Sequence, residues 1–130
     1  MSTENILIVE DDFKSRKLLR DVLSASGYKT FEADNAEDGV KIAQESLPDL
    51  ILMDIRLPGM SGIDALHVLR NDAKTAAIPV IAVTASVMES QKAEAIGAGF
   101  DAVESKPVNI KSLLEAIRKF IERKPLSETT

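Results

Sequence analysis

Side chains able to bind a cation or a phosphoryl group follow short apolar runs at four places in the chain. They are, in chain order, the acids Glu10, Asp11 and Asp12, then Asp54, Thr84 and Lys106. Carboxylates brought together in a partly dry cleft repel one another unless a cation lies between them. The chain has no cysteine, so the ligands would be oxygen atoms, which suit hard ions such as Mg²⁺, Mn²⁺ or Ca²⁺. The pattern therefore indicates a divalent cation site.

The same residues suit phosphoryl chemistry. A cation would keep the acids ionised and neutralise charge on an incoming phosphoryl group, while Lys106 supplies a second, mobile positive charge. In that arrangement Asp54 is a nucleophile. The alternative is that these acids only cap helices or face water, as a single Asp at a strand end usually does. Convergence from four separate strand ends favours a site.

The apolar runs are expected to form the strands that position these residues. Three compact runs, Ile6–Val9, Leu50–Met53 and Val80–Val83, are too short for helices and are typical of parallel strands buried on both faces. Tyr28–Ala33 and Phe100–Val103 mix charged with apolar residues, as strands at the margins of a sheet do. Five strands result.

Segments of helical periodicity separate the strands. Apolar residues recur at three-to-four spacing in the first and last of these segments, at Leu18, Leu19, Val22 and Leu23, and at Ile110, Leu113, Leu114, Ile117 and Ile121. Helix starts are marked by Asn35 with Asp38 and Ser61 with Asp64, and helix ends by Gly27, Gly97 and Gly99.

Strict alternation of strands and helices predicts an α/β fold of the flavodoxin-like class. We expect a (βα)5 open parallel five-stranded sheet in the order 2-1-3-4-5, covered by helices on both faces. The carboxyl ends of the strands would then share one edge, where such folds bind ligands.

Length and composition limit the function further. The chain has 130 residues, 45% of which are hydrophobic. We therefore expect one domain over residues 1–130, without an output domain and with a short polar tail at 125–130. The formal charge is −5 and no basic block occurs, which argues against nucleic-acid binding. The short apolar runs and the absence of a cationic start argue against membrane insertion and export. A soluble cytoplasmic protein is expected.

Four runs, ILIVEDD, PDLILMDIRLPGMSG, IPVIAVTA and ESKP, resemble those of response-regulator receiver domains of the CheY-like superfamily over nearly the whole chain. The sequences of these runs are most similar to those of stand-alone members of the family. The resemblance implies a phosphoacceptor at Asp54 and a Mg²⁺ site, with Mn²⁺ as a substitute, at Glu10, Asp11, Asp54 and the main-chain carbonyl of Arg56. It also implies that Thr84 and Lys106 bind the phosphoryl oxygens.

The resemblance extends to neighbouring positions. Arg56 and Ser86 stand where receivers tune the lifetime of the phosphoryl group, although Ser86 also suits a helix start. Pro107 is a candidate for a cis peptide bond. One position departs from the family: many receivers carry a Tyr or Phe three residues before Lys106, whereas this chain has Val103, which has no ring to rotate.

The expected partners are a histidine kinase or phosphotransfer protein as donor, and a downstream protein that reads the face of the fourth helix, fifth strand and fifth helix. A monomer or a weak phosphorylation-dependent dimer is expected. Because self-phosphorylation and self-dephosphorylation are not turnover on a substrate, the chain is not expected to be an enzyme.

Two other functions fit the sequence less well. A phosphorylation-independent adaptor would leave the pocket idle, which the intact set of acids, Thr84 and Lys106 argues against. An aspartate-nucleophile phosphatase needs a second acid two residues after the nucleophile, where this chain has Arg56. The single histidine, His67, is expected within the third helix and away from the strand ends. Asp12 suits the cap of the first helix better than a metal ligand.

Overall fold

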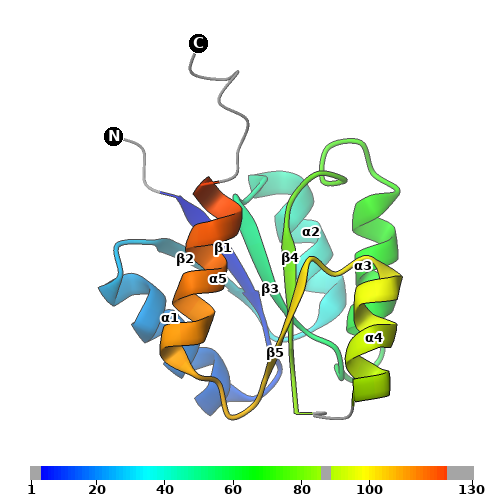
Figure 1. Ribbon diagram of the computed structural model, residues 1–130. Helices are drawn as coiled ribbons and strands as arrows, with labels where there is room; N and C mark the ends of the chain where they lie inside the picture. Colours follow the sequence, from blue (N-terminus) through cyan, green and yellow to red (C-terminus); the bar gives the residue numbers. More distant parts are fainter. Residues whose placement is uncertain (1–3, 86–88, 123–130) are drawn as a thin grey trace.

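The computed structural model describes residues 4–85 and 89–122, which form five strands alternating with five helices (Figure 1). The strands are β1 Asn5–Val9, β2 Lys29–Ala33, β3 Leu50–Asp54, β4 Val80–Thr84 and β5 Ala102–Ser105. The helices are α1 Phe13–Ala25, α2 Ala36–Ser46, α3 Gly62–Arg70, α4 Glu89–Ala98 and α5 Ile110–Glu122.

All strands are parallel and lie in the order β2-β1-β3-β4-β5, so the predicted flavodoxin-like fold is confirmed. Strands β3 and β4 are buried along their whole length, and β1 after its first residue. The two margin strands, β2 and β5, remain partly exposed. The apolar runs thus take the central positions, where both faces of a strand are covered.

Alternate residues of the central strands serve two separate cores. Leu7 and Val9 of β1 face one core, which α2, α3 and α4 complete, whereas Ile6 and Ile8 face a second core with α1 and α5. Figure 1 shows α1 and α5 in front of one side of the sheet. This alternation follows from the two-residue period of a strand.

Polar side chains begin four of the helices. The side chains of Asp12, Asn35, Ser61 and Asn109 each accept a hydrogen bond from the backbone N–H three residues later, at 2.9, 2.8, 3.1 and 2.9 Å. Each bond satisfies a donor that the first helical turn leaves free. The predicted starts of α2 and α3 are therefore confirmed, and Asp12 is a helix cap.

Two expectations for the region before β5 are wrong. The strand begins at Ala102 rather than Phe100, because α4 reaches Ala98 and Gly99 then turns the chain with a φ of +118°. Phe100 is buried and its N–H donates to the carbonyl of Ala95, so it belongs to the helix ending. Of the two glycines expected at the end of this helix, Gly99 follows its last residue as expected, whereas Gly97 lies within it.

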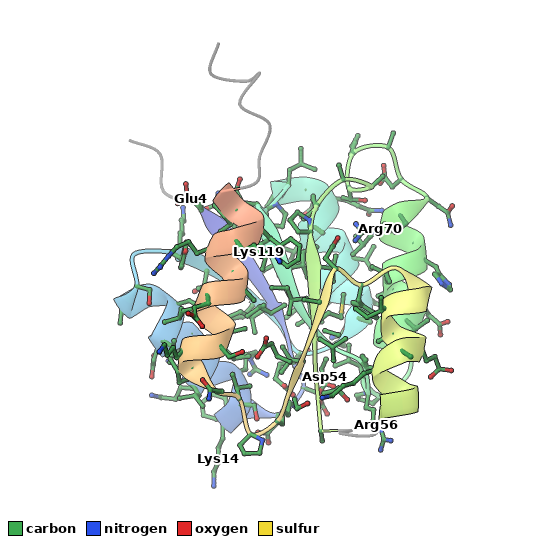
Figure 2. The ribbon with its side chains drawn as sticks, viewed as in Figure 1. Glu4, Lys14, Asp54, Arg56, Arg70 and Lys119 are labelled. Carbon is green, nitrogen blue, oxygen red and sulfur yellow. The ribbon has the colours of Figure 1, made fainter. Side chains whose placement is uncertain are left out.

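Arg70, the last residue of α3, ties several segments together at the amino end of the sheet. Its guanidinium donates to the carbonyls of Ala76, Ile78 and Gly99 and to the carboxylate of Asp101. Figure 2 shows Arg70 and Asp54 toward opposite ends of the molecule. Within the described ranges, no helix has the length and apolar character needed to cross a bilayer.

Candidate functional site

Four strand ends bring the predicted residues to one edge of the sheet. Glu10 directly follows β1, Asp54 and Thr84 are the last residues of β3 and β4, and Lys106 directly follows β5. One carboxylate oxygen from each of Glu10, Asp11 and Asp54 lies within 4.8 Å of the other two. Glu10 and Asp54 are buried, whereas Asp11 is exposed to solvent. Two of the three acids are thus buried and one faces solvent, and we refer to these acids together with Lys106 as the acidic cleft.

The Asp54 carboxylate is held from two directions and is only 6% exposed. Its Oδ1 accepts a hydrogen bond from the backbone N–H of Arg56 at 3.0 Å. Its Oδ2 accepts one from the ammonium of Lys106 at 3.1 Å. The Arg56 side chain points to solvent (Figure 2), so this residue contributes its main chain to the site. Charge-assisted bonds of this kind fix the direction of a carboxylate.

Glu10 and Lys106 form the shortest ion pair of the cleft. The ammonium lies 2.6 Å from Oε1 of Glu10, whose residue is 1% exposed. Burial raises the pKa of Glu10, although the ammonium and the N–H of Asp12 act in the opposite direction. Burial also tends to lower the pKa of Lys106, but the carboxylates of Glu10 and Asp54 outweigh it and raise that pKa. The ammonium of Lys106 therefore supplies the positive charge within the cleft.

Thr84 and Lys106 are adjacent through the backbone. The N–H of Lys106 donates to the carbonyl of Thr84 at 2.8 Å, and Thr84 is 3% exposed. The peptide bond between Lys106 and Pro107 is cis. Val103 pairs with Ala82 of β4 and packs, partly buried, against the first core. Position 103 thus holds a packing residue beside the strand that carries Thr84.

The turn between β3 and α3 passes very close to Asp54. A side chain at Gly62 would lie against the carbonyl oxygen of Asp54 and 2.8 Å from Cα of Ile55. The N–H of Gly62 donates to the carbonyl of Ile55 at 2.9 Å. Gly59, earlier in the turn, has a φ of +77°, which favours glycine. These glycines let the start of α3 close over the end of β3.

The remaining predicted residues lie differently. His67 is exposed on α3, outside the acidic cleft, as expected. Asp12 caps α1, and this hydrogen bond to Ser15 lowers its pKa. Ser86 lies outside the described residues.

Sequence reasoning missed Arg16. From α1 its guanidinium reaches back to the carbonyl of Glu10 at 2.9 Å and pairs with Glu32 of β2 at 3.3 Å. The helical periodicity of α1 predicts only which of its apolar residues are buried. An arginine between those residues would be expected to face solvent. Only the three-dimensional path of the β1–α1 turn brings it to the acids.

The cleft fits a hard divalent ion. Three carboxylates and one ammonium leave it with an excess of negative charge, and all of the acidic donors are oxygen atoms. Oε1 of the buried Glu10 accepts no hydrogen bond from the described residues, so its ion pair with Lys106 is the contact that a cation could replace.

Known proteins share both the sequence and the fold. The chain is 39% identical over 119 residues to the polar-differentiation response regulator DivK of Brucella ovis, covering 92% of this chain and 97% of DivK. A CheY-like response regulator receiver domain protein from Methanospirillum hungatei superposes with a TM-score of 0.85 at 30% identity, covering 93% of this chain and 95% of that one. The resemblance to receiver domains of the CheY-like superfamily that the motifs predicted is confirmed.

A further neighbour bears on the cation. The receiver domain of a sensor histidine kinase from Pseudomonas aeruginosa, at 26% identity and a TM-score of 0.86, covers 93% of this chain and 99% of its own. It carries a magnesium ion coordinated in its active-site cleft. The protein-family model of the response regulator receiver domain matches residues 6–118 of this chain. The chain therefore belongs to the receiver domains of two-component response regulators.

Proposed function

We propose that this receiver accepts a phosphoryl group on Asp54 in a Mg²⁺-dependent reaction. The observation that carries the proposal is the position of the Asp54 carboxylate. It is buried at a strand end, between the Lys106 ammonium and the Arg56 N–H, and within 4.8 Å of two further acids. Asp54 is thus a fixed oxygen nucleophile beside both a resident positive charge and a set of cation ligands.

The residues of the acidic cleft would have separate roles in phosphoryl transfer. An oxygen of Asp54 attacks the phosphorus of a phosphohistidine or small phosphodonor, the bond from phosphorus to the donor breaks, and its electron pair leaves with the donor. Glu10, Asp11, Asp54 and the Arg56 carbonyl would hold Mg²⁺, or Mn²⁺ in its place, and such an ion supplies charge neutralisation at the phosphoryl oxygens. Lys106 and the Thr84 hydroxyl would then bind those oxygens.

The position of Lys106 suits a role in signalling. Its ammonium now lies between two carboxylates, and a phosphoryl group on Asp54 would offer it oxygens of higher charge. The backbone bond from Lys106 to Thr84 joins this movement to the ends of β4 and β5. We infer that the face formed by α4, β5 and α5 reports the change to a downstream protein.

Receiver domains act in general with a phosphodonor and an effector, and they are not enzymes in the usual catalytic sense. For this chain we propose a histidine kinase or phosphotransfer protein as donor. A mainly apolar groove of about 180 Å³ lies beside the acidic cleft, between α1 and the turn after β5. It supports the approach of a donor protein at this edge. Loss of the signal would follow water attack on the acyl phosphate in the same cleft.

Phosphorylation with a small donor tests the proposal. Protein incubated with acetyl phosphate and Mg²⁺ should gain one phosphoryl group, which mass spectrometry of borohydride-trapped peptides should place on Asp54. The Asp54→Asn variant should gain none, and wild type with chelator should react far more slowly. Labelling elsewhere, or full labelling of Asp54→Asn, would overturn the proposal. Asp64→Asn is a matched control, since Asp64 is an exposed acid at the start of α3.

A further inference from the structure

The proposed function assigns no role to Arg16, although its side chain is only 17% exposed and its contacts reach the acidic cleft. Arg16 lies one turn into α1, where its own N–H bonds to the carbonyl of Asp12. Its Nη1 donates to the carbonyl of Glu10 at 2.9 Å. That carbonyl belongs to the peptide unit that joins Glu10 to Asp11, the two acids that follow β1.

The Glu10 backbone is therefore held on both sides. Its N–H donates to the carbonyl of Ala33 at the end of β2, at 3.0 Å, and its carbonyl accepts from Arg16. Rotation of the peptide between Glu10 and Asp11 would break the second bond. Since the two carboxylates leave the chain on either side of that peptide, its orientation sets the direction of both.

Arg16 is itself fixed by two neighbours. Its Nε lies 3.3 Å from Oε1 of Glu32 on β2, so one planar guanidinium joins the edge strand to the β1–α1 turn. The same guanidinium lies over the ring of Phe13, 5.6 Å from its centroid. A lysine could supply the charge, but not two directed bonds from one rigid plane.

We propose that Arg16 is a positioning residue for the divalent cation site, acting through the peptide between Glu10 and Asp11. The inference rests on the proposed function in one respect, the place of the cation. Arg16 itself touches neither the ion nor the phosphoryl group. Residues that orient metal ligands typically change metal affinity by about 10-fold to 100-fold when they are removed.

The sign of the effect separates positioning from simple electrostatics. A positive charge near a cation site repels the cation, so if Arg16 acted only through its charge, its removal would tighten Mg²⁺ binding. If it orients the acids, its removal weakens binding. Arg16→Met keeps the apolar stem of the side chain and removes both the charge and the directed bonds.

Arg20 provides the matched control. It pairs with the same Glu32, with Nη1 3.6 Å from Oε2, and within the described residues it forms no hydrogen bond or ion pair with Glu10. Arg20→Met therefore removes the same charge from the same helix without touching the peptide of Glu10. Arg16→Lys keeps the charge and loses the planar fork.

The experiment is a calorimetric or amide-NMR titration of each variant with Mg²⁺, with urea unfolding in parallel as a check on the fold. Arg16→Met and Arg16→Lys should raise the dissociation constant by about 10-fold, with shifted amide signals at Asp11, while Arg20→Met leaves it unchanged. Tighter or unaltered binding by both Arg16 variants would overturn the inference. If Arg16→Met does not fold, Arg16→Lys decides between these outcomes.

The two proposals fail in different ways. A wild-type protein that binds Mg²⁺ but is not phosphorylated on Asp54 contradicts the proposed function and leaves the role of Arg16 to the titrations. A wild-type protein that binds no Mg²⁺ contradicts both. Normal phosphorylation of the wild type together with unaltered affinity in the Arg16 variants contradicts the role of Arg16 alone.

Discussion

The ammonium of Lys106 lies 2.6 Å from Oε1 of Glu10, a carboxylate in a residue that is 1% exposed. A buried carboxylate without a counter-charge is costly, so this ion pair supports the cleft while no metal is bound. The same position is the one from which a divalent ion would displace the ammonium. In the proposed site, Lys106 and the ion would therefore compete for Glu10.

Removal of the ammonium should expose this competition. Lys106→Met is expected to lower the free energy of unfolding by about 1–3 kcal/mol without Mg²⁺, because Glu10 loses its partner. Saturating Mg²⁺ should stabilise the variant more than the wild type, since the stability that a ligand adds to the folded state rises with the logarithm of its affinity. Urea unfolding with and without Mg²⁺ measures both effects. Lys14→Met removes an exposed lysine from α1 as a control, and equal Mg²⁺ responses in Lys106→Met and wild type would refute the competition.

The raised pKa of Glu10 predicts a pH dependence. Burial makes the folded protein bind a proton at Glu10 more tightly than the unfolded chain does, so without metal this residue's contribution to stability falls as pH rises from 4.5 through the raised value. Saturating Mg²⁺ should reverse the slope, because the ion binds the ionised carboxylate. Chemical unfolding of wild type and Glu10→Gln across this range measures the difference. A difference between the two proteins that does not change with pH would contradict the prediction.

The close approach of Gly62 to the end of β3 predicts a large effect of a single methyl group. Gly62→Ala places Cβ against the backbone of Asp54 and Ile55, and should destabilise the fold by about 1–3 kcal/mol through forced backbone shifts. Gly97→Ala is the control, since a Cβ there meets nothing within 4 Å and alanine favours a helix by about 0.5–1 kcal/mol. Thermal unfolding of both variants checks the signs. A neutral Gly62→Ala would show that the turn can relax.

Val103 and Thr84 should behave differently in a switching assay. Val103→Ala removes two methyl groups beside Ala82 and should cost about 1 kcal/mol of stability with little change in the response to a phosphoryl mimic. Thr84→Ala removes the proposed hydroxyl contact and should abolish the response near Ala85. Amide NMR spectra with beryllium fluoride at saturating Mg²⁺ compare them. Loss of the response in Val103→Ala alone would make position 103 a switch element.

Much of the fold could be predicted because its signals are local. Buried parallel strands have continuous apolar runs in the sequence. Cap residues such as Asn35 and Ser61 mark the start of a helix directly after them. The expected start of β5 at Phe100 is wrong because this residue has strand propensity, whereas in the fold its buried ring packs at the end of α4. Tertiary packing overrode the local preference there.

The acidic residues of the site could be predicted from the sequence, but the side chains that hold them in place could not. Strand topology alone carries Glu10, Asp54 and Lys106 to one edge. The bond of Arg16 to Glu10, over a sequence separation of six residues, depends on where a long side chain ends. The same is true, at the opposite end of the sheet, of the bond of Arg70 to Asp101 over 31 residues. No periodicity records such contacts.

The balance of charge in the acidic cleft also sets an order of events. With Glu10, Asp11 and Asp54 ionised and Lys106 protonated, the cleft carries two net negative charges, which one divalent ion cancels. A phosphodonor, which is itself an anion, would be repelled by the empty cleft and not by the filled one. We therefore expect the ion to bind before the donor. At a fixed donor concentration, the rate of phosphorylation should then follow the fraction of protein that already holds the ion.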